Sequence, residues 1–177
     1  MSNDGKRLII SIDPGSGISS PTGLTVFDPH TKEILYASNI STKFKQLAHR
    51  IKDISDQVER VFKEVEESAS DREIVVTIES FVMRGKGGET LQRLIGGFLS
   101  KTPYLFRIEH VQNSTIKKVL AGHGHADKNS VAVGTKDYFT SNPDSLALIN
   151  KLLSKQELDI LDSLAIGVTW VKQQQSG

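Results

Sequence analysis

The sequence predicts a single α/β domain, residues 1–177, built on a mixed five-stranded sheet flanked by helices. Three observations support this class: short apolar runs bounded by turn residues, amphipathic segments between them, and no linker long enough to divide the chain. The first three runs follow one another closely, as in a β-meander, and the later runs alternate with helical segments. We therefore expect one mixed sheet.

Five segments have the strand pattern. Residues 7–13 (RLIISID) form an apolar run that stops at Pro14-Gly15, and residues 73–79 (EIVVTIE) form another that also ends in a carboxylate. Ligands gather beside the carboxyl ends of strands in α/β sheets, so the two terminal acids, Asp13 and Glu79, are candidate site residues. The other expected strands are residues 22–27, 33–38 and 104–111.

Helices are expected between and after these strands. In residues 44–65 apolar side chains recur at spacings of three and four, with Ser41 or Thr42 as the N-cap. Residues 89–100 and 114–120 predict two shorter helices, and Asp127 is placed to cap the next one. The final helix is expected to open with a capping box at residues 154–157 (SKQE).

The composition excludes several classes of protein. There is no cysteine, which excludes disulfides and thiolate metal sites. No apolar stretch approaches the roughly 20 residues that span a bilayer, and the N-terminus (MSNDGKRLIISID) lacks the features of a signal peptide. We expect a cytoplasmic protein with no membrane contact.

Charge is unevenly distributed, although the net charge is only +1. Residues 80–140 carry nine Lys or Arg and four acids, so this stretch is basic and the rest of the chain is acidic. Two interpretations stay open: a surface that faces phosphates, or ordinary solvated faces. The basic residues are Arg84, Lys86, Arg93, Lys101, Arg107, Lys117, Lys118, Lys128 and Lys136.

Two further acids lie in the apolar segment LDILDSLAIGVTW, residues 158–170. Asp159 and Asp162 are three residues apart and therefore share one face of a helix. Most of the remaining circumference is apolar, so both carboxylates are expected to be at least partly buried. If this face packs beside the first and fourth strands, all four acids converge. Taken singly, each acid also has an ordinary explanation as a turn former, a solvated strand end or a water-facing stripe.

Four carboxylates in a small volume repel one another unless cations lie between them. Hard oxygen ligands suit Mg²⁺ or Mn²⁺. Two such ions about 4 Å apart activate water and stabilise the leaving oxygen in phosphoryl displacement. The acids therefore predict a site with two Mg²⁺ ions, or two Mn²⁺ ions, that hydrolyses phosphodiesters.

Four segments together resemble the RuvC-type Holliday junction resolvases, which have the ribonuclease H-like fold. They are SIDPGS…TGLTVFD, VTIES, KKVLAGHGHADKNSV and DILDSLAIGVTW, and they occur in the family's order over nearly the whole chain. The resemblance implies a homodimeric endonuclease that binds branched DNA and resolves four-way junctions by paired, symmetric, ligatable nicks. The divergent middle of the chain favours a phage origin, which would place the protein in the host cytoplasm rather than at the cell's own nucleoid.

The resemblance also implies roles for individual residues. Asp13 matches the acid that bridges the metals, and Glu79 the acid on the leaving-group side. Asp159 and Asp162 match the C-terminal pair, with Asp162 the direct ligand of the metal on the nucleophile side. Lys128 matches a lysine that holds a phosphate and steadies its developing charge.

Further residues are expected at the DNA or at the dimer interface. Phe81 either stacks on bases at the opened crossover or belongs to the core. The expected interface is the stripe on helix 89–100, unless that stripe packs within the chain. The other expected DNA-binding residues are Arg84, Lys86, Lys117 and Lys118, and the stripe consists of Leu91, Leu94, Ile95 and Phe98.

Three other functions are alternatives to a junction resolvase. A nuclease of the same fold with broader specificity would also cut forks and flaps. A junction-binding protein without catalysis would not need the four acids. A sugar-kinase or actin-like ATPase would need a second phosphate-binding loop and a longer chain. Zinc binding by His123 and His125 is disfavoured because nothing nearby completes a tetrahedral set.

Overall fold

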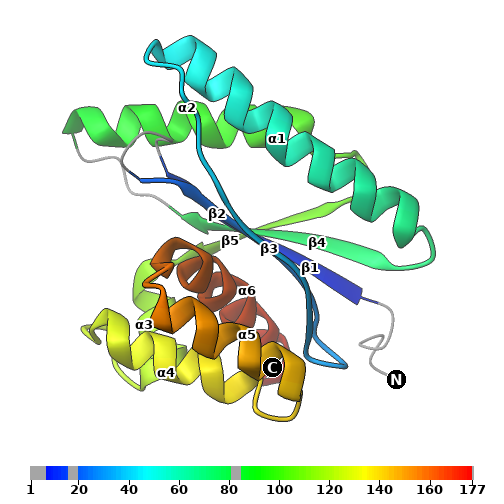
Figure 1. The fold of residues 1–177 in the computed structure, drawn as a ribbon, viewed down its shortest axis with the longest axis vertical. Coiled ribbons are helices and arrows are strands. Elements are labelled where there is room, and N and C mark those ends of the chain that lie inside the picture. The colour runs from blue at the N-terminus through cyan, green and yellow to red at the C-terminus, as the bar shows by residue number, and fades with distance from the viewer. Residues whose placement is uncertain (1–6, 16–19, 81–84, 177) are drawn as a thin grey trace.

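The computed structural model describes residues 7–15, 20–80 and 85–176, without the side chains of residues 85–87. One five-stranded sheet with the order β3-β2-β1-β4-β5 lies between two layers of helices (Figure 1). Neighbouring strands β1, β2 and β3 pair antiparallel, whereas β4 pairs parallel with both β1 and β5, which confirms the predicted mixed sheet. The strands are β1 (Arg7–Asp13), β2 (Thr22–Asp28), β3 (Glu33–Ile40), β4 (Glu73–Ser80) and β5 (Arg107–Gln112).

Two helices cover one face of the sheet and four cover the other (Figure 1). The first layer consists of α1 (Leu47–Ser68) and α2 (Gly85–Lys101). The second consists of α3 (Asn113–Ala121), α4 (Lys128–Tyr138), α5 (Pro143–Ser154) and α6 (Leu158–Ser176). None of the described helices is both long and apolar enough to cross a membrane.

The sheet has a separate apolar core on each face because strand side chains alternate between the two faces. On β1, Ile10 and Ile12 belong to the core beneath α1 and α2, whereas Ile9 belongs to the core shared with α6. Helix α6 is buried along most of its length, from Ile160 to Val171. The last helix therefore lies across the sheet beside β1 and β2, which brings its first turn close to the carboxyl end of β1.

Two glycines allow this close approach of α6. A Cβ atom on Gly167 would lie 2.1 Å from Ser11 Oγ and 2.7 Å from the Phe27 ring. A Cβ atom on Gly23 in β2 would lie 2.0 Å from the backbone oxygen of Asp159. All three distances are far below normal contact, so larger side chains at these positions would push α6 away from the sheet.

Several predicted boundaries are wrong. Helix α1 begins after Gln46, not after Ser41 or Thr42. The expected capping box does not exist, because Ser154 ends α5 and α6 begins at Leu158.

The sequence reading also missed α5 entirely, although this helix begins with a side-chain cap from Asn142 and a proline in its first turn. The expected cap at Asp127 is confirmed, because its carboxylate accepts a hydrogen bond from Ser130 N at 2.8 Å.

Candidate active site

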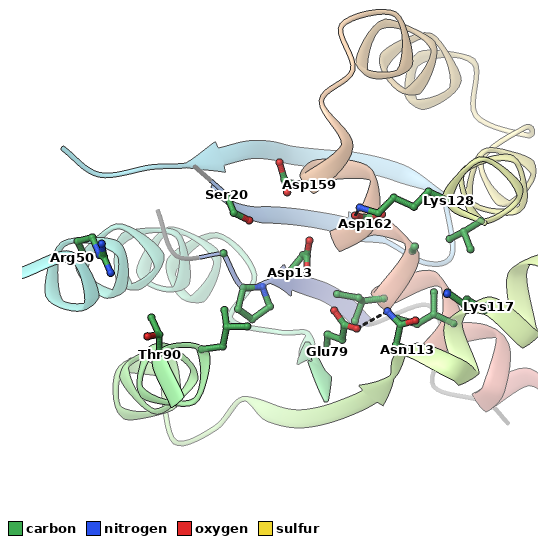
Figure 2. Close-up of a pocket in the computed structure, with 17 residues that line it drawn as sticks. Asp13, Ser20, Arg50, Glu79, Thr90, Asn113, Lys117, Lys128, Asp159 and Asp162 are labelled. Carbon is green, nitrogen blue, oxygen red and sulfur yellow. Dashed lines mark hydrogen bonds and ion pairs between the residues drawn. The ribbon is translucent and has the colours of Figure 1, made fainter. Parts of the chain in front are cut away.

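Four acids from three different elements line one cavity of about 650 Å³ at the carboxyl edge of the sheet. Asp13 ends β1 and Glu79 lies near the end of β4; the two strands are parallel neighbours, with Ile12 opposite Ile78. Asp159 and Asp162 project from the first turns of α6 into the same space (Figure 2). The fold thus gathers residues that are up to 149 positions apart in sequence.

Burial and mutual repulsion perturb these acids. Burial, and then the charges of Asp162, Glu79 and Asp159, raise the pKa of Asp13 to about 8. Burial and the charge of Asp162 raise the pKa of Asp159 as well. Burial also raises the pKa of Glu79, against the effect of a hydrogen bond from Asn113. A carboxyl whose pKa is raised this far marks a site where burial and negative charge outweigh the positive charge of the nearby Lys128.

Two polar side chains of the second helical layer hold two of the acids. Lys128, the first residue of α4, places its Nζ 2.8 Å from Asp162 Oδ2. Asn113, the first residue of α3, donates a hydrogen bond from Nδ2 to Glu79 Oε1 at 2.7 Å (Figure 2). The hydrogen bond to Asp162 raises the pKa of Lys128, so this side chain stays charged.

Buried hydroxyl groups fix the elements beneath the acids. Thr77 Oγ1 donates to Ser11 Oγ at 2.9 Å and ties β4 to β1 two residues before each acid. Ser163 Oγ, on α6, lies 3.1 Å from Thr25 Oγ1 on β2 and is positioned to donate to it. Separating the partners of such a buried hydrogen bond would leave a polar group unsatisfied, which costs free energy. These bonds therefore hold the elements in fixed relative positions.

The end of β1 is also fixed by a single side chain. Thr22 Oγ1 accepts a hydrogen bond from Gly15 N and donates one to Gly15 O, both at 3.1 Å. A Cβ atom on Gly15 would lie 2.1 Å from the backbone oxygen of Pro21, so no larger residue fits there. Asp13 is therefore held by the sheet on one side and by this clamp on the other.

The donor set fits a hard divalent cation. All four candidate ligands are carboxylates, and Mg²⁺ and Mn²⁺ prefer oxygen ligands. Burial and repulsion together raise the pKa of Asp13, and a cation among the acids would offset the repulsion. Within residues 7–15, 20–80 and 85–176, no three Asp, Glu or His side chains are already grouped as ligands of one metal ion.

The predicted DNA-binding residues are distributed as follows. Lys117 and Lys128 line the cavity with the acids. Lys118 is exposed and does not line it. Phe81 and Arg84 lie outside the described residues, as does the side chain of Lys86 in the first turn of α2. His123 and His125 are exposed.

The stripe expected to form a dimer interface on α2 is largely internal. Leu94 and Phe98 are 2% and 0% exposed and belong to the core between α2 and the sheet. These two residues cannot form an interface, and the interpretation as packing within the chain is correct for them. Leu91 lines the cavity and Ile95 is partly buried.

The sequence analysis missed several cavity residues, among them Asn113, Arg50 and Thr90. Asn113 follows β5 directly, and β5 pairs with β4 so that Val111 lies opposite Glu79. A polar residue just past a strand that neighbours β4 was therefore a usable signal. Arg50 and Thr90 lie on helices of the other layer, and no sequence pattern relates them to the acids.

Comparison with known proteins identifies the fold. No protein-family model and no curated protein sequence matches the chain. The Thermus thermophilus RuvC structure is similar with a TM-score of 0.62 and 20% identity over 92% of each chain. T. thermophilus RuvC in complex with Holliday junction substrate gives 0.59 and 20%, covering 92% of this chain and 91% of that chain. The yeast mitochondrial Holliday junction resolvase Ydc2 gives 0.60 and 12%, covering 94% of this chain and 78% of that chain.

The chain has the fold of the RuvC-type resolvases. The predicted ribonuclease H-like fold is thereby confirmed. The resemblance to RuvC-type resolvases that the sequence motifs indicate agrees with all three structures.

Proposed function

We propose that the protein is a metal-dependent endonuclease that resolves four-way DNA junctions by paired, symmetric nicks. The observation that carries this proposal is the gathering of Asp13, Glu79, Asp159 and Asp162 around one cavity with lysines at its rim. The likeness to a RuvC structure in complex with Holliday junction substrate supports branched DNA as the substrate.

The acids would hold the metal. Asp13 lies between Glu79 and the α6 pair, so it would bridge two sites, with Glu79 on the leaving-group side and Asp162, assisted by Asp159, on the nucleophile side (Figure 2). Bound there, two Mg²⁺ or Mn²⁺ ions supply an activated water and stabilise the departing 3′-oxygen. Asn113 keeps the Glu79 carboxylate in one orientation through its hydrogen bond.

Lys128 and Lys117 would bind the DNA backbone next to the scissile phosphate. The Lys128 side chain is 70% exposed although it pairs with Asp162, so a phosphate can reach it. The Lys128 ammonium would stabilise negative charge that develops on the phosphate. Contacts of this kind position the strand without reading its sequence.

Paired nicks require two sites, and each chain supplies one, so we propose a homodimer that faces the junction with both cavities. Since Leu94 and Phe98 belong to the core, the interface would use the remaining part of the α2 stripe, Leu91 and Ile95.

A junction with an immobile crossover tests the proposal. With Mg²⁺ we expect symmetric nicks that ligase can seal, and with EDTA we expect binding without cutting. Forks and flaps in parallel reactions separate a resolvase from a broader nuclease, since equal cutting of all three would contradict junction selectivity. Binding without nicks in either Mg²⁺ or Mn²⁺ would overturn the catalytic assignment.

Matched variants make the test specific to the site. Asp13→Asn should abolish cutting and retain junction binding. Asp71→Asn makes the same chemical change at an exposed turn before β4, at the end of the strand away from Glu79, and should cut normally. Normal cutting by Asp13→Asn would show that the acids do not form the reaction centre.

A further inference from the structure

One cation of the cavity comes from the opposite helical layer. Arg50 lies in the first turn of α1 and lines the same cavity as the four acids. In Figure 2 it lies with Thr90 at one end of the cavity, Lys117 and Lys128 lie at the other, and the acids lie between. The cavity therefore has positive charge on both sides of its acidic centre.

Arg50 combines a place in the cavity lining with a buried nitrogen that is unpartnered within the described part of the chain. Its Nε is buried and has no hydrogen-bond partner among the described residues, and its Nη1 makes a long 3.4 Å contact with the backbone oxygen of Lys45. The first turn of α1 carries no acidic residue that could pair with it. Four other arginines each form an ion pair with a carboxylate: Arg7, Arg72, Arg93 and Arg107.

Neutralising the acids does not explain Arg50. Within the described residues it forms no ion pair with any of the four, whereas Lys128 bonds directly to Asp162. Lys128 is also the cation that lowers the pKa of Asp13, against the stronger effects of burial and the other acids. Arg50 is thus a charged group at the cavity wall with hydrogen-bond donors that have no acceptor in the described chain. A buried donor without an acceptor costs free energy, and an acceptor that binds it removes this cost.

An anion with several oxygen atoms would supply acceptors for the free guanidinium donors of Arg50. A guanidinium presents parallel N–H groups that match a phosphate with two hydrogen bonds, and an arginine keeps its charge at any physiological pH. A DNA strand laid across the carboxyl edge of the sheet would pass from the α3 and α4 side to the α1 and α2 side. Its backbone would meet lysines at one end of the cavity and Arg50 at the other.

We propose that Arg50 binds a backbone phosphate of the strand being cut, on the side of the scissile bond opposite to Lys117 and Lys128. This inference rests on the proposed function and adds a second phosphate contact on the DNA strand, which lies on the other side of the scissile bond. Two anchors that flank the acids would hold the scissile phosphate over them, because a strand fixed on one side only can swing away.

The test compares Arg50→Gln with Arg60→Gln, a matched change at an exposed position on the same helix. Binding to an immobile four-way junction is measured in EDTA over a range of salt concentrations. We expect Arg50→Gln to bind about tenfold more weakly. The slope of log K against log salt should fall by about 0.7–0.9, the value of one phosphate contact. Arg60→Gln should match the wild type.

Junctions with a single neutral methylphosphonate locate the contact. One position beside the cleavage site should weaken the wild type about tenfold and leave Arg50→Gln unaffected, because that contact is already lost. For Lys117→Gln the insensitive position should lie on the other side of the scissile bond. Should Arg50→Gln melt differently from the wild type, Arg50→Lys replaces it and should show a partial loss at the same phosphate.

The outcomes separate this inference from the proposed function. If the wild type neither binds nor nicks the junction, the proposed function fails and the Arg50 contact fails with it. If the wild type does both, while Arg50→Gln keeps the full salt slope and the wild-type methylphosphonate pattern, only the Arg50 assignment is overturned.

Discussion

The ammonium group of Lys128 lies 2.8 Å from Asp162 Oδ2, which joins the first residue of α4 to the start of α6 across the cavity. Burial and the charges of three acids, of which Asp162 has the strongest effect, raise the pKa of Asp13 to about 8. The lysine therefore supplies to this cluster part of the positive charge that a divalent cation would supply in full. In the proposed nuclease, Lys128 would lie between the metal-binding acids and the phosphate.

Replacing Lys128 with glutamine should lower the nicking rate far more than junction binding. The loss of one preorganised positive charge at a reacting phosphate corresponds to about 100-fold in rate, whereas one phosphate contact among many changes binding modestly. Single-turnover cutting and a binding isotherm on the same junction measure both. Lys118→Gln is the control, since Lys118 is exposed outside the cavity lining and its loss should barely affect cutting.

Asp13→Asn should stabilise the metal-free protein, and the gain should grow with pH. The pKa of Asp13 is about 8 in the folded protein against an ordinary value of 3.8, so between these values the folded state holds a proton that the unfolded state lacks. Stability then falls as pH rises toward 8. The amide cannot ionise, so the variant escapes this loss.

Urea unfolding in EDTA measures this effect. We expect Asp13→Asn to exceed the wild type by about 1–2 kcal/mol in free energy of unfolding at pH 8, with a smaller difference at pH 5. Asp71→Asn should leave the pH dependence unchanged. Equal pH dependence of Asp13→Asn and the wild type would contradict the burial of this carboxyl among like charges.

Magnesium should stabilise the protein, and more strongly at higher pH. Metal binding requires ionised carboxylates, so the proton on Asp13 must leave first and the apparent Kd should decrease from pH 6 to pH 8. At a concentration 100 times the Kd, the gain in unfolding free energy is about 2.7 kcal/mol. Thermal melting with increasing Mg²⁺ at each pH tests this, and Asp13→Asn should lose most of the shift.

Those parts of the fold that depend on local pattern could be predicted from the sequence. The apolar runs that end at Asp13 and Glu79 gave β1 and β4, and the apolar face around Asp159 and Asp162 placed both acids half-buried. The start of α1 could not be placed in this way. Phe44 continues the helical spacing, but it is 40% exposed and lies before the helix. The periodicity of apolar residues alone therefore does not show where a helix begins.

The partners of the acids depend on how whole layers pack, which no local pattern encodes. Arg50 reaches the cavity only because α1 lies across the sheet with its first turn at the carboxyl edge. The Ser154 motif has the residues of a capping box, but the preceding turns already belong to α5. A motif is thus informative only when the element before it has been recognised.

Two glycine substitutions test how closely α6 approaches the sheet. Alanine usually stabilises a helix interior by about 0.5–1 kcal/mol relative to glycine, and Gly96→Ala on α2 should do so, because its Cβ would meet nothing within 4 Å. Gly167→Ala should instead destabilise by about 1–3 kcal/mol, the usual cost of overpacking. Its Cβ would lie 2.1 Å from Ser11 Oγ. Urea unfolding of both variants measures the contrast, and a stabilised Gly167→Ala would contradict the packing of α6 on β1.

Asn113→Ala should reduce nicking while junction binding stays near the wild type. The Asn113 amide donates a 2.7 Å hydrogen bond to Glu79 Oε1, so its loss leaves a candidate metal ligand free to rotate. Removing such a supporting partner typically costs about 10–100-fold in metal affinity or activity. Cutting rates measured over a range of Mg²⁺ concentrations separate a loss of metal affinity from a loss of activity with metal bound. If only metal affinity is lost, raised Mg²⁺ should restore much of the rate. Ser114→Ala, a change at the next and exposed residue, should cut normally; equal loss in both variants would point to a disturbed α3 rather than to the Glu79 contact.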